Sequence, residues 1–149
     1  MLKKKRVFTR KRALTLVLFC AAALLMLILL RWHFNSGDDL STPEGRERFL
    51  AGLGWEIDLG SEERKNVIIP DQLDGVLLEY NRMQLEQGCD LNRHLGERCE
   101  QYTYTLTNYP NQSQTVLVTL YVQGRELIAG DIHTTSINGF MHGIVRREG

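Results

Sequence analysis

Residues 99–134, CEQYTYTLTNYPNQSQTVLVTLYVQGRELIAGDIHT, contain three successive runs in which apolar and polar side chains alternate. Alternation with a period of two is typical of a strand that buries one face. The runs span 99–108, 115–122 and 126–134, and only short turns separate them. Because short turns join antiparallel neighbours, this stretch predicts an antiparallel meander.

A long helix is predicted upstream of the meander, after Pro70, with Asp71 as its N-cap and Gly88 at its end. At about 100° per residue, its apolar side chains gather on one side. This side consists of Leu73, Val76, Leu77, Tyr80 and Met83. We expect these side chains to cover one face of the sheet.

Two features precede the long helix. A short helix is predicted from Thr42 to Gly52 or Gly54, because threonine followed by proline is a common helix start. Two strand runs, 55–59 and 67–69, follow with a turn between them. The order of elements predicts an α+β domain in which the long helix packs on an antiparallel sheet of four to five strands.

The chain before this domain contains an uncharged segment of eighteen residues, Ala13 to Leu30. As a helix it would span about 27 Å, close to the roughly 30 Å thickness of the bilayer hydrocarbon. Seven Lys and Arg residues precede it, which predicts that the N-terminus is cytoplasmic. We therefore predict a single-pass cell-membrane protein whose parts are a basic cytoplasmic tail (1–12), a transmembrane helix (13–32), a linker (33–41) and an extracytoplasmic domain (42–149).

Two other targeting signals compete with this interpretation. A cleaved signal peptide requires a shorter apolar core followed by small residues, whereas this core ends in Leu30, Arg31 and Trp32. A lipoprotein anchor at Cys20 requires a small residue where Phe19 stands. We therefore expect an uncleaved anchor, with the lipid bilayer as the partner of residues 13–32.

The charge of the predicted external part is strongly negative. Residues 34–149 contain ten basic and eighteen acidic side chains, which gives a net charge of −8. Nucleic-acid binding depends on Lys and Arg at phosphates, so this balance predicts that nucleic acid is not a partner.

Two cysteines lie ten residues apart in the predicted external domain. Cys89 and Cys99 could pair as a disulfide outside the cytoplasm, or both could remain free thiols. His94 lies midway between them, and Asp90 or Glu97 could complete a zinc site. Structural zinc sites usually contain a close Cys-x-x-Cys pair, which this chain lacks. We therefore predict no metal or other cofactor.

A second polar group occurs near the C-terminus. Asp131 and His133 point the same way on the last predicted strand, and His142 follows soon after. A carboxylate and two imidazoles could bind a metal, which makes a metal-assisted envelope hydrolase the alternative function. No nucleophile signature accompanies them, so the prediction is a protein without catalytic residues.

A possible interaction surface combines two apolar features. Leu78 and Leu85 lie on the flank of the predicted long helix, where they widen its core face or form an exposed stripe. Phe140, Met141 and His142 lie between two glycines, and this segment could dock on the core or present an aromatic tip to a ligand. The leading prediction is a noncatalytic domain that binds a protein, a peptide or a cell-envelope component.

Several short blocks in this sequence occur in a fixed order. They are Gly54-Trp55, Ile69-Pro70, Glu79-Tyr80-Asn81, Gln84, Gln87-Gly88, Asp90-Leu91, Tyr102-Thr103-Tyr104, Asn108-Tyr109-Pro110, Gly130-Asp131 and Gly139-Phe140-Met141-His142-Gly143. The series covers roughly residues 54–143. It resembles a bacterial family of single-pass membrane proteins whose C-terminal extracytoplasmic domain is catalogued as a domain of unknown function. The resemblance implies a bacterial surface location and supplies no activity, substrate or catalytic residue.

Overall fold

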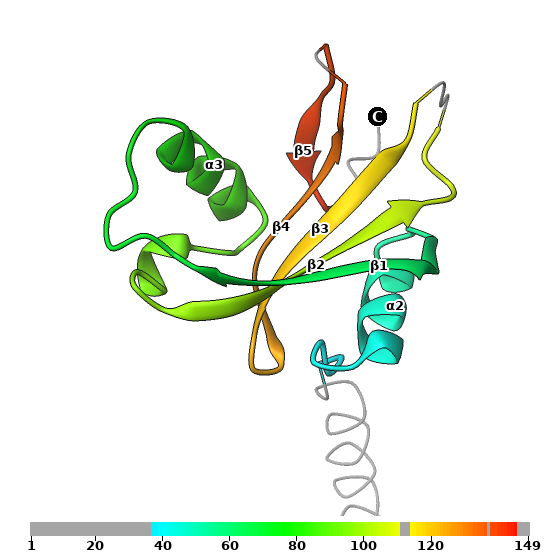
Figure 1. Ribbon diagram of the computed structural model, residues 1–149, viewed down its shortest axis with the longest axis horizontal. Helices are drawn as coiled ribbons and strands as arrows, with labels where there is room; N and C mark the ends of the chain where they lie inside the picture. The colour runs from blue at the N-terminus through cyan, green and yellow to red at the C-terminus, as the bar shows by residue number, and fades with distance from the viewer. Residues whose placement is uncertain (1–36, 111–113, 137, 146–149) are drawn as a thin grey trace, which may run out of the picture. The chain divides into compact units, whose positions relative to one another are not determined.

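The computed structural model describes residues 37–110, 114–136 and 138–145. The predicted transmembrane helix lies outside these residues, and no helix within them is long and apolar enough to cross a membrane. Residues 38–149 form one compact unit, shown in Figure 1. Its elements are α2 (Pro43–Gly52), β1 (Ile57–Ile68), α3 (Gly75–Glu86), the 3-10 helix η1 (Leu91–Arg93), β2 (Arg98–Leu106), β3 (Val116–Gln123), β4 (Glu126–Thr134) and β5 (Met141–Gly143).

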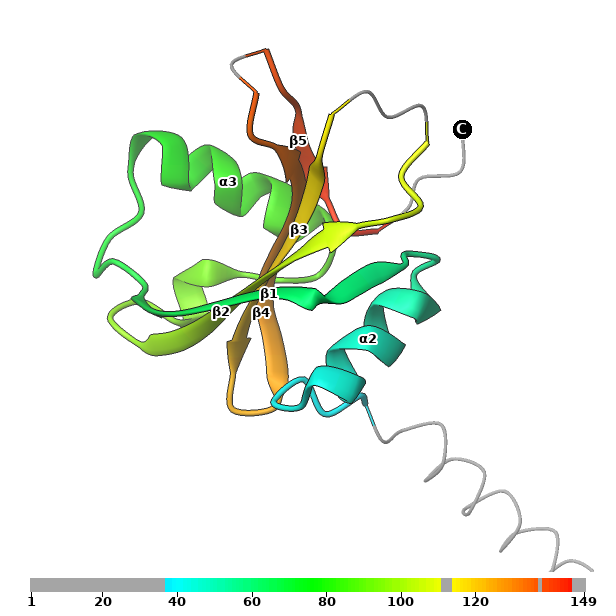
Figure 2. The same cartoon turned by 45° about the vertical axis from the view of Figure 1, so that its right-hand side comes forward.

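The five strands form one antiparallel sheet in the order β1-β2-β3-β4-β5. The predicted α+β class and the meander are therefore confirmed for the described residues. Figure 2 shows α2 beside β1 and α3 near β5, so the two helices contact opposite edges of the sheet.

The start of α2 follows its sequence signals. The Thr42 hydroxyl accepts a hydrogen bond from the Gly45 N–H at 3.1 Å, and Pro43 is the first helical residue. A side chain on Gly45 would meet the Asp39 carbonyl oxygen at 1.9 Å. The Asp39 carbonyl, in the turn before α2, can therefore approach the first turn of the helix this closely only because residue 45 is glycine.

The predicted break between two early strands is wrong. β1 is one continuous strand, with an irregularity between Asp58 and Glu63. Ser61 lies in this bulge, and its hydroxyl accepts a hydrogen bond from the Thr105 N–H at 2.8 Å. Because a side chain replaces the missing strand partner, Gly60 and Ser61 kink β1 without ending it.

The predicted start of the long helix is also wrong, and its buried face is correct only in part. α3 begins at Gly75 after its N-cap Asp74, and Gly75 has a φ of +46°, which favours glycine. Leu73, Leu77 and Tyr80 pack in or against the core as predicted, but Val76 is 85% exposed. The side chains that α3 buries fully belong to Asn81 and Gln84, whose amides hydrogen-bond to neighbouring segments, so the helix is rotated from the position that apolar periodicity predicts.

Two core clusters hold the sheet to its helices. The larger joins α2 and Trp55 to side chains of β2, β3 and β4: Tyr102, Tyr104, Leu106, Val116, Val118, Leu120, Val122 and Ile132. The smaller joins the α3 and η1 region to the sheet through Ile69, Leu73, Leu91, Cys99, Ile128 and Ala129. Since adjacent strand residues point to opposite faces, Cys99 and Tyr102 belong to different sides of β2.

A buried arginine fastens α2 to the sheet. Arg46 is 1% exposed, and its guanidinium donates hydrogen bonds to Tyr104 Oη at 2.5 Å, Glu62 Oε2 at 2.8 Å and the Leu40 carbonyl at 2.8 Å. Its Cζ lies 3.5 Å from the centroid of the Tyr102 ring. Burial disfavours the Glu62 carboxylate, but hydrogen bonds from Tyr104 and Arg46 outweigh burial and lower its pKa.

Candidate functional site

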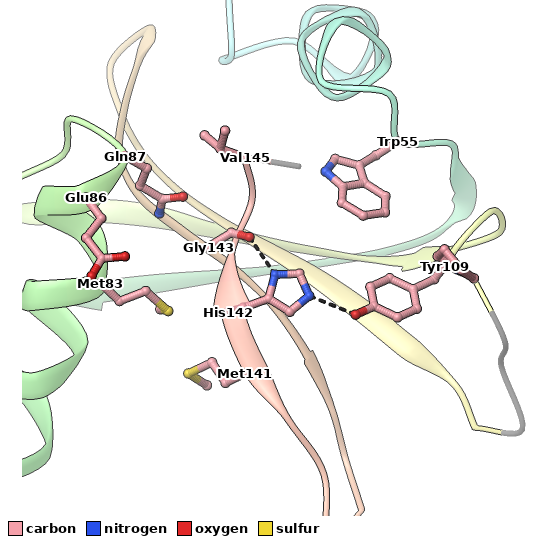
Figure 3. A pocket seen from close by; sticks show the side chains of 10 residues that line it. Trp55, Met83, Glu86, Gln87, Tyr109, Met141, His142, Gly143 and Val145 are labelled. Carbon is pink, nitrogen blue, oxygen red and sulfur yellow. Dashed lines mark hydrogen bonds between the residues drawn. The ribbon is translucent and has the colours of Figure 1, made fainter. Parts of the chain in front are cut away.

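An open groove lies beside β5, between the C-terminal half of α3 and the segment that follows β2 (Figure 3). Trp55, Tyr109 and Pro110 line one side, and Met83, Glu86 and Gln87 line the other. Residues 141–143 of β5 and Val145 lie between them. We call this the aromatic groove. Its volume of about 760 Å³ is within the range of small-molecule and peptide side-chain sites.

Four rings cluster at one side of the groove: Trp55 stacks on Tyr109, and Tyr109, Phe140 and His142 contact one another, with the Tyr109 and His142 centroids 5.8 Å apart. The ring centroids of Trp55 and Tyr109 are 5.7 Å apart, those of Tyr109 and Phe140 are 5.1 Å apart, and those of Phe140 and His142 are 5.5 Å apart. The corresponding interplanar angles are 9°, 20° and 15°. Offset stacking of this kind stabilises aromatic pairs beyond the area that they bury. The groove therefore has one rigid aromatic side.

Long-range hydrogen bonds hold these rings in position. Trp55 is 3% exposed, and its indole N–H donates to the Ile144 carbonyl at 2.6 Å. Asn108 precedes Tyr109, and its side chain accepts from the Glu56 N–H and donates to the Gly54 carbonyl, both at 3.0 Å. These bonds fix the segment after β2 against the segment before β1.

Both ring nitrogens of His142 have partners, as the dashed lines in Figure 3 show. Nδ1 is 2.7 Å from the Gly143 carbonyl oxygen, which can only accept. In the neutral imidazole Nδ1 is therefore the donor, and Nε2 accepts from the Tyr109 hydroxyl at 2.9 Å. A role as metal ligand or general base would require His142 to break one of these bonds.

Two glutamines, Gln84 in α3 and Gln87 at its C-cap, stop the pairing of β4 with β5 after Gly143. Gln84 is fully buried and pairs with Gly130 as a strand residue would, accepting from its N–H at 2.8 Å and donating to its carbonyl at 3.0 Å. Gln87 donates to the same carbonyl at 2.6 Å and accepts from the Ile144 N–H at 2.8 Å. In the β4–β5 register, Asp131 pairs with Gly143, so Gly130 and Ile144 would pair next. The glutamine amides take up these groups instead, and we call this arrangement the glutamine clamp.

The clamp also explains a glycine in the groove. A side chain on Gly143 would meet Gln87 Oε1 at 2.5 Å. Only glycine lets the Gln87 amide approach β5 this closely. The clamp thereby sets the position of α3 relative to the groove.

The predicted interaction surface is divided in the structure. Met141 and His142 line the aromatic groove, and Phe140 stacks on its rings. Leu78 and Leu85 are 42% and 53% exposed on α3, but they do not line the groove. The two parts of the predicted surface are therefore separate features.

The three residues of the alternative hydrolase site do not converge. His133 Nδ1 lies 3.2 Å from Asp131 Oδ2, and this hydrogen bond raises the pKa of His133, although burial opposes the shift. His142 pairs with Ile132, which points to the opposite face from Asp131 and His133. Within the described part of the chain, no three His, Cys, Asp or Glu side chains are grouped to hold a metal ion. The geometry that the alternative requires is absent from this region.

Of the two alternatives left open by the sequence for Cys89 and Cys99, the structure contains the free thiols and not the disulfide. Burial raises the pKa of both thiols. His94 Nδ1 lies 2.9 Å from Glu97 Oε2 and 3.0 Å from Gln123 Oε1, so this imidazole belongs to a surface network. The zinc arrangement considered from the sequence is therefore not formed either.

Several groove residues were not identified from the sequence. Trp55 was interpreted as a strand residue and Tyr109 as a turn residue, and only the fold brings them together. A large aromatic side chain beside a proline in a turn was the available signal for Tyr109. Gln84 and Gln87 occur in the series of blocks that carries the family resemblance, but neither position indicates a role, because exposed glutamines are common on helices.

Comparison of the chain with protein-family models, with curated proteins and with solved structures finds no match. The resemblance to the bacterial membrane-protein family stays a prediction from the sequence.

Proposed function

We propose that this chain is a single-pass membrane protein whose domain, residues 42–149, lies outside the cytoplasm and binds a peptide segment of a partner protein without catalysis. The observation that carries the proposal is the aromatic groove beside β5. An apolar side chain of the bound segment would enter the groove against the stacked rings.

The chemistry of the groove supports a side-chain binding site. Tyr109 is half-buried, while Met141 and Val145 are 55% and 48% exposed, so apolar atoms are accessible beside a rigid wall. Methionine adapts its shape to different apolar partners, and aromatic residues are frequent anchors of protein interfaces. Both kinds of residue line this groove.

Charge indicates which segment fits. Residues 34–149 carry a net charge of −8, and Glu86 lines the groove. Opposite charge on a partner accelerates association and disfavours acidic competitors. We therefore expect a segment in which an aromatic or large aliphatic residue lies close to Lys or Arg.

The proposal is tested with a random peptide library selected against the full chain in lipid nanodiscs. We expect enrichment of peptides with an aromatic or large aliphatic residue close to a basic one. Affinities of the selected peptides are then compared between wild type, Tyr109→Ala and Val145→Lys, which places a like charge beside the basic residue of the peptide. The matched control is Leu85→Lys, which also adds an ammonium at an exposed apolar position but outside the groove.

The two groove substitutions should weaken binding about 30-fold or more, because loss of an interface anchor typically costs about 2 kcal/mol. The Leu85→Lys variant should bind as wild type does. A selection without enrichment, or groove variants with wild-type affinity, would contradict the proposal.

A further inference from the structure

A second cavity lies on the other side of the Met83 and Met141 side chains, which line both cavities. Its volume is about 410 Å³, and its lining includes Leu77, Tyr80, Tyr121 and Asp131. Most of this lining is apolar or aromatic. The exceptions are Glu79 and Asp131, of which Asp131 is only 3% exposed.

The Asp131 carboxylate can accept further hydrogen bonds from a cation bound in this cavity. Its oxygens contact the Tyr80 hydroxyl at 3.4 Å and His133 Nδ1 at 3.2 Å. A carboxylate accepts about four hydrogen bonds, so these contacts leave acceptor capacity. The described side chains that line the cavity include a second carboxylate, Glu79, but no Lys or Arg.

Two aromatic rings meet beside this carboxylate. The centroids of Tyr80 and Tyr121 are 6.3 Å apart, and their planes form an angle of 73°. Burial, and then the charge of Asp131, raise the pKa of Tyr121 to about 12 and raise that of Tyr80 as well. The hydroxyls therefore stay protonated, and the ring faces can attract a cation.

We propose that this cavity binds the ammonium group of a lysine side chain. The ammonium would donate to Asp131, and the four methylenes would lie against Met83, Met141 and Leu77. Lysine buries its aliphatic stem along apolar surface and carries a compact charge, which matches this combination of groups.

An arginine side chain fits less well. A guanidinium binds best when its fork meets both oxygens of one carboxylate. In this cavity each oxygen of Asp131 already has a protein partner, Tyr80 on one side and His133 on the other. An ammonium is a compact point charge that can bind one carboxylate oxygen without the fork geometry, so the arrangement favours lysine.

This inference rests on the proposed function, because the lysine is taken to belong to the peptide in the aromatic groove. The two cavities share Met83 and Met141, so one extended segment could contact both. The lysine would then be the basic residue that lies close to the apolar anchor.

The test uses the full chain in nanodiscs with ¹³C-methyl methionine. The chain contains four methionines, and Met83 and Met141 report on the cavity after assignment by Met83→Leu and Met141→Leu substitution. Three probes are titrated: Nα-acetyl-lysine amide, the uncharged Nα-acetyl-norleucine amide and Nα-acetyl-arginine amide. Nanodiscs without protein correct for partitioning of the probes into lipid.

We expect saturable shifts of the Met83 and Met141 signals with the lysine probe, at a Kd of about 1 mM. The norleucine and arginine probes should bind at least tenfold more weakly. Asp131→Asn should weaken lysine binding by about tenfold or more, because it removes the negative charge that the ammonium contacts. Glu63→Gln, which removes an exposed carboxylate on β1, should leave binding within twofold of wild type.

Equal binding of the lysine and norleucine probes to wild type would overturn the inference, and this comparison needs no variant that could misfold. Unchanged lysine binding in Asp131→Asn would overturn it as well. If selected peptides bind the aromatic groove while the lysine probe fails, the inference falls and the proposed function stands. If the lysine probe binds through Asp131 but no selected peptide binds, the proposed function falls instead.

Discussion

Replacement of Gln84 by alanine should destabilise the domain more than any exposed substitution on α3. Gln84 is fully buried, and the change removes one methylene, which contributes about 0.8 kcal/mol, together with the carboxamide. It also leaves the buried Gly130 N–H without its acceptor, at a cost of about 1–3 kcal/mol. The Gly130 carbonyl keeps its bond from Gln87. We therefore expect a loss of about 3 kcal/mol from a total stability of about 5–15 kcal/mol.

Urea unfolding of residues 38–149 measures this loss, because Trp55 is the single tryptophan in that range and is buried in the larger core. The control is Gln72→Ala, which removes an exposed glutamine from the loop before α3. Hydrogen exchange adds a local reading, since the Gly130 and Ile144 amides should exchange faster in Gln84→Ala. A loss below about 1 kcal/mol, equal to that of the control, would refute the glutamine clamp.

Three further substitutions test other parts of the structure. Arg46→Ala should lower the free energy of unfolding in urea by about 3–5 kcal/mol, because it leaves the partly buried Glu62 carboxylate without its cation. A loss below about 1 kcal/mol would show that the ion pair is not essential for stability. Gly143→Ala should cost about 1–3 kcal/mol through its clash with Gln87, and the double variant with Gln87→Ala should lose less than the sum of the two single changes; strict additivity would contradict the clash. Asp131 raises the pKa of His133 in the folded state. The interaction between the two side chains therefore stabilises the fold fully below the unfolded-state pKa of about 6.5, and this stabilisation is lost as the pH rises through the folded-state pKa. Stability measured between pH 5.5 and 8.5 should therefore fall more in wild type than in His133→Gln, and parallel curves would contradict this linkage.

Local signals predicted the elements whose stability depends on nearby residues. The N-cap Thr42 and the following proline gave the start of α2 correctly, and the alternation over 99–134 gave the three strands of the meander. The sequence also gave turn chemistry at Gly60 and Ser61, but not its outcome. A hydroxyl that substitutes for a strand partner cannot be recognised before the partner strand is known.

The errors on α3 have a related cause. Apolar periodicity assumes that apolar side chains face the core, whereas α3 turns Asn81 and Gln84 inward. Gln84 is buried because Gly130, distant in sequence, offers an unpaired N–H and carbonyl at the end of β5. The apolar pattern of the helix cannot show that the Gly130 N–H and carbonyl lack a partner on the neighbouring strand.

The candidate site was predicted in part. The segment from Phe140 to His142 was identified because two glycines flank it. Trp55 and Tyr109 were missed as site residues, since their contact joins the start of β1 to the turn after β2. Asp131 was considered with the wrong partner: it lies with Tyr80 and Tyr121 beside α3, while His142 points to the opposite face.

The affinity of a selected peptide for wild type and for Val145→Lys, measured in nanodiscs, reports directly whether the peptide occupies the aromatic groove. Val145 is 48% exposed and lines this groove, so the substitution adds a positive charge there without disturbing the core. We predict binding at least about 30-fold weaker in Val145→Lys and unchanged in Leu85→Lys. Equal affinity of wild type and Val145→Lys would show that the peptide does not occupy the groove and would contradict the proposed function.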